Sequence, residues 1–70
     1  MSATKDYRKA VWMVQSRDSD AQIAEYKAAG IDAEPEWSNR LQKPVTGPRA
    51  LYLARALENK LCITRIVKAA

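Results

Sequence analysis

The residues best suited to chemistry in this 70-residue chain are three carboxylates at alternate positions, Asp32, Glu34 and Glu36. Alternate residues of a strand share one face and lie roughly 6.8 Å apart, so neighbouring members of the set could flank a hard cation such as Mg²⁺. A magnesium site needs further oxygen ligands from elsewhere in the chain, and no pattern supplies them. We therefore interpret these carboxylates as a solvated strand edge or a partner-facing acidic strip, and we predict no metal ion.

Other catalytic groups are scarce. The chain has no histidine, which removes the commonest general base and metal ligand. Cys62 begins an apolar run, where a buried, unreactive thiol is expected. The two glycines, Gly30 and Gly47, are too few for a glycine-rich phosphate loop. Residues 46–49 could hold an anion at a helix start, but an ordinary cap with an exposed arginine is favoured. We predict that the chain is not an enzyme and binds no cofactor.

Charge is divided unevenly along the sequence. Residues 18–36 hold six acids and one base, whereas residues 37–70 hold seven bases and one acid. Such a polarised distribution favours docking by electrostatic complementarity over catalysis.

Length and composition indicate one small domain. We expect a polar N-terminal arm at residues 1–8 and a single α+β domain at residues 9–68. No apolar run approaches a membrane span, the start of the chain lacks a secretory signal, and there is one cysteine. These features predict a cytoplasmic protein with no membrane contact.

Hydrophobic periodicity predicts the elements that position these residues. Residues 9–15 form a strand-like apolar run. Ser19 is expected to cap a helix that ends at Gly30. Residues 31–37 alternate like an edge strand, and residues 38–39 could turn into a second arm at residues 40–45. A second helix opens at residues 46–48 and carries an apolar stripe of Ala50, Leu53, Ala54, Leu57 and Leu61. Residues 62–67 form the last strand.

These elements predict an α+β fold, a small two-layer sandwich with two helices on one face of a mainly antiparallel sheet of three to four strands. With the arm at residues 40–45 accepted as a strand, the order is β-α-β-(β)-α-β, the split βαβ or ferredoxin-like plan. Without that arm, the sheet has three strands.

The candidate partner-binding residues lie in the basic half of the chain. They are Arg40, Lys43, Arg49, Tyr52, Arg55 and Lys60. Trp12 and Trp37 are candidates for stacking on nucleic-acid bases from the sheet face, and a core role for both is the alternative.

The layout of the chain resembles that of SPOR domains. The resemblance rests on the run at residues 11–15 before a helix, on residues 28–33 (Ala-Ala-Gly-Ile-Asp-Ala), and on Val-Thr-Gly-Pro at residues 45–48. It covers most of the chain and implies a split βαβ unit that binds peptidoglycan glycans. The glycine and phenylalanine that usually follow the first strand are missing.

Three functions remain open from the sequence. The leading one is a non-enzymatic adaptor or inhibitor-type module that docks on a protein or nucleoprotein partner through its charge-polarised surface. The alternatives are direct RNA or DNA binding through the basic helix and sheet aromatics, and SPOR-like glycan binding. The sequence leaves the oligomeric state undetermined.

Overall fold

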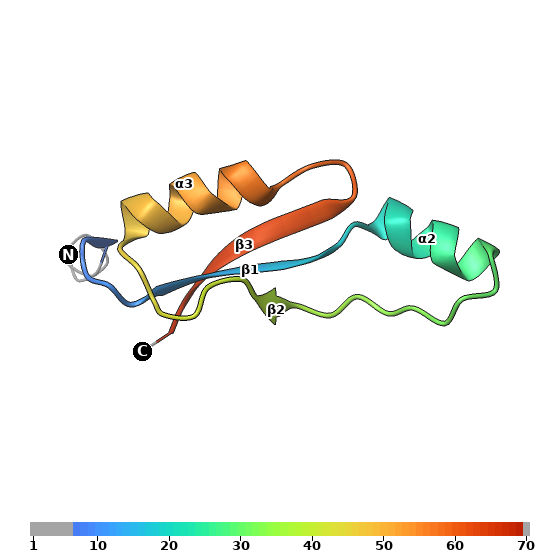
Figure 1. The fold of residues 1–70 in the computed structure, drawn as a ribbon, viewed down its shortest axis with the longest axis horizontal. Helices are drawn as coiled ribbons and strands as arrows, with labels where there is room; N and C mark the ends of the chain where they lie inside the picture. The colour runs from blue at the N-terminus through green and yellow to red at the C-terminus, as the bar shows by residue number, and fades with distance from the viewer. Residues whose placement is uncertain (1–6, 70) are drawn as a thin grey trace.

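The protein is a small α+β structure in which one helix lies on a sheet and a second helix projects from the end of that sheet (Figure 1). A computed structural model describes residues 7–69. Its elements, in chain order, are β1 (Trp12–Asp18), α2 (Asp20–Ala28), β2 (Ser38–Asn39), α3 (Gly47–Leu57) and β3 (Cys62–Lys68).

The sheet formed by the described residues has three antiparallel strands in the order β2-β1-β3. β1 is central and pairs with β3 along its whole length, from Trp12 opposite Lys68 to Asp18 opposite Cys62. The other edge of β1 is paired with the short β2 and then with Val45, whose backbone N–H and C=O both bond to Trp12, at 2.8 and 2.9 Å. β1 therefore has a hydrogen-bonded neighbour along both of its edges.

The core lies between β1 and α3. Val14 and Ala50 have no exposed surface, and Ala54 is 6% exposed. Half-buried side chains surround these three: Trp12, Leu41, Val45, Leu53, Leu57 and Ile66. The small residues on the inner side of α3 let the helix approach the sheet closely, and the apolar stripe expected for this helix is confirmed from Ala50 to Leu57.

Both long strands were predicted with small shifts. β3 begins at Cys62 as expected, and β1 lies three residues later than the predicted run at residues 9–15. The expected N-terminal arm is largely outside the described residues, since residues 1–6 are not among them.

The edge strand predicted at residues 31–37 is wrong. This segment is extended but forms no strand in the described structure, and Ser38 and Asn39, expected as a turn, form β2 instead. The reason is positional: α2 carries the chain beyond the end of β1, so the returning residues reach the sheet only at Ser38. Pro35 also lacks the N–H that a ladder needs. A fourth strand is therefore absent from residues 7–69.

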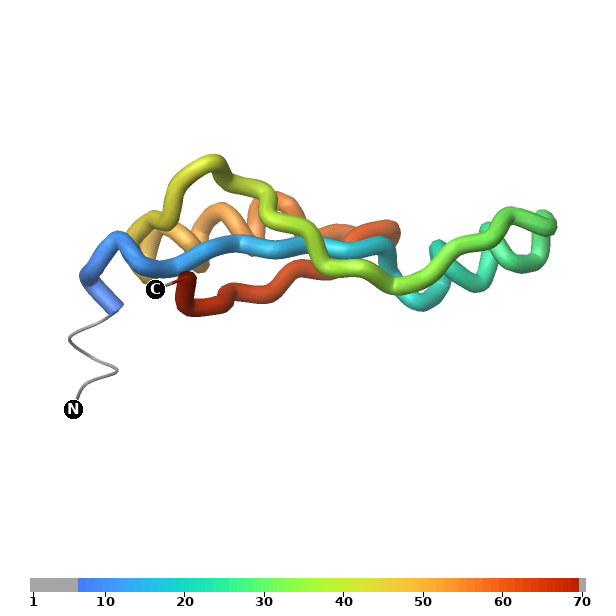
Figure 2. The backbone as a smooth tube through the Cα atoms, turned by 90° about the horizontal axis from the view of Figure 1, so that it is seen from below, coloured from blue at the N-terminus to red at the C-terminus, as the bar shows by residue number. Residues whose placement is uncertain are grey.

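The prediction that two helices cover one sheet face is also wrong. Only α3 packs on the sheet, whereas α2 extends along the long axis away from it (Figures 1 and 2). α2 has few large apolar residues, chiefly Ile23 and Tyr26, so burial against the sheet would gain little. Leu61, expected to extend the stripe of α3, lies beyond the helix and is 59% exposed.

α2 is fixed to the rest of the molecule at its first turn. Ser19 is 8% exposed, and its Oγ accepts a bond from the Gln22 N–H at 3.2 Å while donating to the Lys60 carbonyl at 2.9 Å. The Ser19 N–H donates to the Leu61 carbonyl at 3.0 Å. The predicted cap is confirmed, and Gly30 ends the helix with a φ of 82° that glycine adopts without strain.

Ser19→Ala is therefore expected to lower the free energy of unfolding by about 1–2 kcal/mol, because it removes the cap and leaves the Lys60 carbonyl without its donor. Thr46→Ala is the matched control: Thr46 is the N-cap of α3, but its side chain makes no capping bond. Urea denaturation followed by circular dichroism measures both. Equal losses from the two variants would contradict the assigned role of Ser19.

Candidate functional site

The outer side of α3 presents a basic, partly aromatic surface. Arg49, Tyr52 and Arg55 are exposed there, and Lys60 follows in the turn after the helix. The Arg49 guanidinium lies 6.0 Å from the centre of the Tyr52 ring, and Tyr52 is 66% exposed. These four residues are called the α3 basic face. Arg49, Tyr52 and Arg55 project outward because Ala50 and Ala54 are buried on the opposite side of the helix.

Neither Arg55 nor Lys60 forms an ion pair within the described residues, where the one salt bridge joins Arg17 to Asp20 at 3.1 Å. Their charges are therefore available to an acidic partner. An exposed cation that keeps its water shell gains little from a single pair, so affinity from this surface requires several contacts at once.

Arg40 and Lys43, also predicted as binding residues, lie before α3 in the segment that runs beside β1. Arg40 is held against β1 by two hydrogen bonds. Its Nη1 donates to the buried Ser16 Oγ at 3.1 Å, and its backbone N–H donates to the Val14 carbonyl at 2.9 Å. Lys43 is exposed. The structure therefore separates these two residues from the α3 basic face.

The two tryptophans have different environments. Trp12 is half-buried and packs against the hydrophobic core on the side of α3. Trp37 is half-buried as well, but its ring is contacted by two guanidinium groups, that of Arg65 at 4.3 Å and that of Arg17 at 5.3 Å from the ring centre. Of the two stacking candidates, Trp37 is therefore the one whose ring lies next to arginine side chains.

Polar side chains extend this arrangement across the sheet face opposite α3, because Gln15, Arg17 and Arg65 alternate with the core residues of their strands. The Gln15 Oε1 accepts from the Arg65 Nε at 2.8 Å. The Gln15 Nε2 donates to the Asn39 Oδ1 at 2.8 Å. The Trp37 cluster comprises Gln15, Arg17, Trp37, Asn39 and Arg65. Sequence reasoning named only Trp37, since the pairing of Gln15 with Arg65 depends on a strand register that the sequence does not reveal.

Negative charge is concentrated in residues 19–37, which we call the acidic arm. The arm comprises α2 and the segment that returns from α2 to the sheet. The arm holds five acids (Asp20, Glu25, Asp32, Glu34 and Glu36) and one base (Lys27), a net charge of −4. Residues 40–60 hold five bases and one acid, a net charge of +4. The molecule measures 47 × 22 × 20 Å, with the acidic arm at one end of the long axis and α3 toward the other (Figure 1). The sequence polarity is thus also a spatial polarity.

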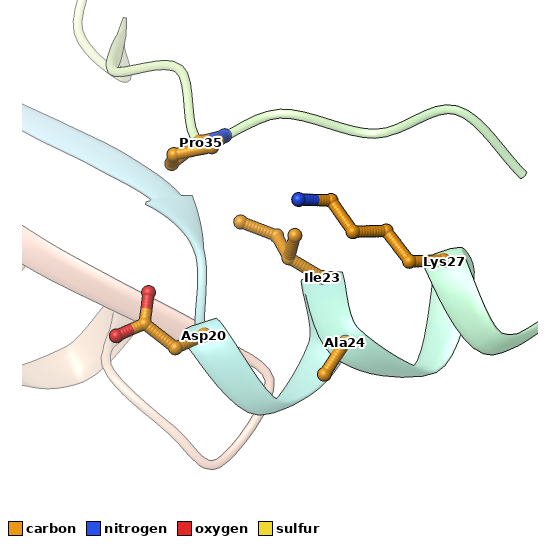
Figure 3. A pocket seen from close by; sticks show the side chains of 5 residues that line it. All are labelled: Asp20, Ile23, Ala24, Lys27 and Pro35. Carbon is orange, nitrogen blue, oxygen red and sulfur yellow. The ribbon is translucent and has the colours of Figure 1, made fainter.

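A shallow hollow of about 270 Å³ lies between α2 and the returning segment. Figure 3 shows Ile23 and Lys27 reaching from the helix toward Pro35. Asp32, Glu34 and Glu36 are exposed, and no three metal-ligating side chains gather within the described part of the chain. Cys62 is half-buried, with its Sγ 3.9 Å from the Ile63 carbonyl oxygen. Asp20 and Lys27 are the ionisable side chains that line the hollow, and Asp20 is paired with Arg17.

The fold and its surfaces define a small α+β protein with two polar surfaces on opposite sides of one sheet. Comparison of the chain with protein-family models, curated proteins and solved structures finds no match. The similarity to SPOR domains therefore rests on the sequence motifs alone. No helix within residues 7–69 is long and apolar enough to cross a bilayer. Function has to be inferred from the surfaces themselves.

Proposed function

We propose that this protein is a non-enzymatic binding module that docks on a protein or nucleoprotein partner through the α3 basic face. The observation that supports this proposal is that one helix carries the exposed Tyr52 ring together with Arg49 and Arg55, which form no ion pair with another described residue. Arginine and tyrosine are enriched where interfaces gain most of their affinity. A helix packed on a sheet also presents these side chains in a fixed geometry, which reduces the entropy lost on binding.

The partner segment that fits this face is acidic and contains an apolar side chain. Arg49, Arg55 and Lys60 would meet the carboxylates, while Tyr52 and the neighbouring Leu51, 38% exposed, would bury apolar area. A cytoplasmic location fits a chain with one cysteine. For the fold, we propose a derivative of the ferredoxin-like plan in which the extended residues 31–37 take the place of the second strand without forming one.

Single-stranded nucleic acid is the second candidate, and the Trp37 cluster favours it. An aromatic ring among arginines on an open sheet face is an arrangement that binds bases and phosphates together. The acidic arm counts against this function, because its carboxylates repel phosphate.

Arg49→Glu/Arg55→Glu is expected to reduce recovery of the partner at least about 10-fold in affinity capture from the native host followed by mass spectrometry. The reason is that like charges placed opposite each other replace attraction by repulsion. Arg8→Glu/Lys9→Glu is the matched control, since it makes the same change in net charge at exposed positions outside both the α3 basic face and the acidic arm.

Recovery of the same proteins by wild type and the Arg49→Glu/Arg55→Glu variant would exclude the α3 basic face as the docking surface. Nuclease treatment of the captured material separates the two candidate functions. Loss of the captured material on nuclease treatment, together with binding that falls steeply with salt and with Trp37→Ala, would establish nucleic acid as the ligand.

A further inference from the structure

The acidic arm makes few contacts with the rest of the described chain, chiefly the Arg17–Asp20 salt bridge and the contacts of Trp37 with Arg17 and Arg65. Of its side chains, Ile23 is 6% exposed and faces Pro35 within the arm itself, whereas Ile31 is 53% exposed (Figure 3). Beyond the hydrogen bonds at Ser19 and the Arg17–Asp20 salt bridge, α2 makes few contacts with the sheet and α3 within the described residues. A nine-residue helix in this position gains little stability from its own chain, so a surface that covers it would stabilise the fold.

The shape of the molecule leaves unusually large area for such a surface. A compact protein of this mass exposes roughly 4,400 Å², whereas this chain exposes 5302 Å². The radius of gyration is 14.3 Å, compared with about 11 Å for a compact 70-residue domain. The excess area of roughly 900 Å² is similar to the share of one partner in a standard protein interface, about 800 Å².

Charge identifies what fits the acidic arm. The arm carries a net −4, and the α3 basic face carries three positive charges, those of Arg49, Arg55 and Lys60. Both also offer apolar side chains, Ile31 on the arm and Tyr52 on α3. α2 and α3 lie toward opposite ends of one elongated molecule (Figure 2), and the arm meets the α3 basic face at its base, where the Ser19 Oγ donates to the Lys60 carbonyl. α2 therefore does not cover α3 within the same chain.

We propose that the protein forms a two-fold symmetric dimer in which the acidic arm of each copy lies along the α3 basic face of the other. Two elongated copies side by side in opposite directions bring both pairs of surfaces together at once. The two contacts are identical by symmetry, and the assembly closes without leaving a surface for further copies. This inference rests on the proposed function in that the second copy is a protein partner of the same α3 basic face.

The test uses two charge-reversed forms of the full chain. The face-reversed form is Arg49→Glu/Arg55→Glu, and the arm-reversed form is Glu25→Lys/Glu34→Lys. All four positions are exposed, so both forms are expected to keep the circular dichroism spectrum of the wild type. Sedimentation velocity is measured at low salt over a range of micromolar concentrations.

Wild type is expected to sediment with twice the chain mass of 7.9 kDa. Each reversed form alone is expected to be monomeric, with its dimer dissociation constant raised at least about 10-fold. An equimolar mixture of the two forms is expected to restore dimer formation in part. In the mixed pair one contact joins an unaltered acidic arm to an unaltered α3 basic face, whereas the other joins an arm of zero net charge to the reversed face. Monomeric wild type, or a mixture that stays monomeric, overturns the proposal.

The sedimentation experiment and the capture experiment test the dimer and the docking function separately. Monomeric wild type combined with loss of captured proteins in the face-reversed form removes the dimer and leaves the docking function standing. If the wild type is a dimer, the mixture of the two reversed forms restores that dimer in part, and the face-reversed form captures the same host proteins as the wild type, then self-association is supported. The proposed docking of the α3 basic face on a host partner is then removed. Dimerisation that is unaffected by either reversal places the interface elsewhere and overturns the proposal as well.

Discussion

Val14→Asp is expected to unfold the protein at 25 °C. Val14 has no exposed surface and lies at the centre of the cluster formed with Ala50 and Ala54. A carboxylate at this position would be buried without a donor or a counter-ion, at a cost of about 4 kcal/mol or more. A chain of this length has a total stability of roughly 4–10 kcal/mol, and its small core places it toward the lower end. Far-UV circular dichroism and amide proton dispersion measure the loss.

Ala21→Asp is the control for the added charge, since Ala21 is exposed in the first turn of α2, where an acid is favourable. This variant is expected to retain the fold and to lose less than about 0.5 kcal/mol. A folded Val14→Asp variant would mean that β1 and α3 do not enclose a dry core, and would remove the structural basis for a rigid α3 surface.

Ala50→Leu is expected to lower the free energy of unfolding by about 1–3 kcal/mol, which is the usual cost of overpacking. Ala50 lies on the inner side of α3 with no exposed surface, opposite Val14. Three additional carbons would push the helix away from β1 and disturb the neighbouring bond from Thr64 Oγ1 to the Ala54 carbonyl, 3.1 Å long. Thermal and urea denaturation report the change.

The matched control is Ala56→Leu, the same substitution on an exposed position of the same helix. Its effect is expected to stay within about 0.5 kcal/mol, because leucine and alanine have similar helix propensities and no neighbour is displaced. If Ala50→Leu were as stable as this control, α3 would have room to move on the sheet, contrary to the close approach that alanine allows.

Local signals predicted the elements in which side-chain pattern and backbone preference agree. The stripe of α3, the β-branched residues of β3 and the cap at Ser19 all identify structures that the chain forms at those positions. The alternation at residues 31–37 was misleading, because alternation reports the pattern of a strand but not whether a neighbour is present to pair with it. Pro35 reduces that pairing further.

Tertiary placement could not be derived in the same way. Packing of α2 on the sheet would gain free energy by burying its small apolar area and would lose free energy by removing its charged side chains from water. The spacing of residues in the sequence does not show which of these two effects is larger. The Trp37 cluster likewise depends on the register that sets Gln15 opposite Arg65. The α3 basic face was accessible to sequence reasoning because one helix contributes most of its members.

The pairing of β1 with β3 has a consequence for how the protein folds. The two strands come from opposite ends of the chain, yet they form the longest ladder in the sheet and, together with α3, enclose the core. Contacts between residues far apart in sequence form late and slow the folding reaction. During synthesis, β1 emerges before β3, and its edge stays unpaired until β3 is available. Until that ladder forms, the exposed edge of β1 is the site most open to pairing with other chains.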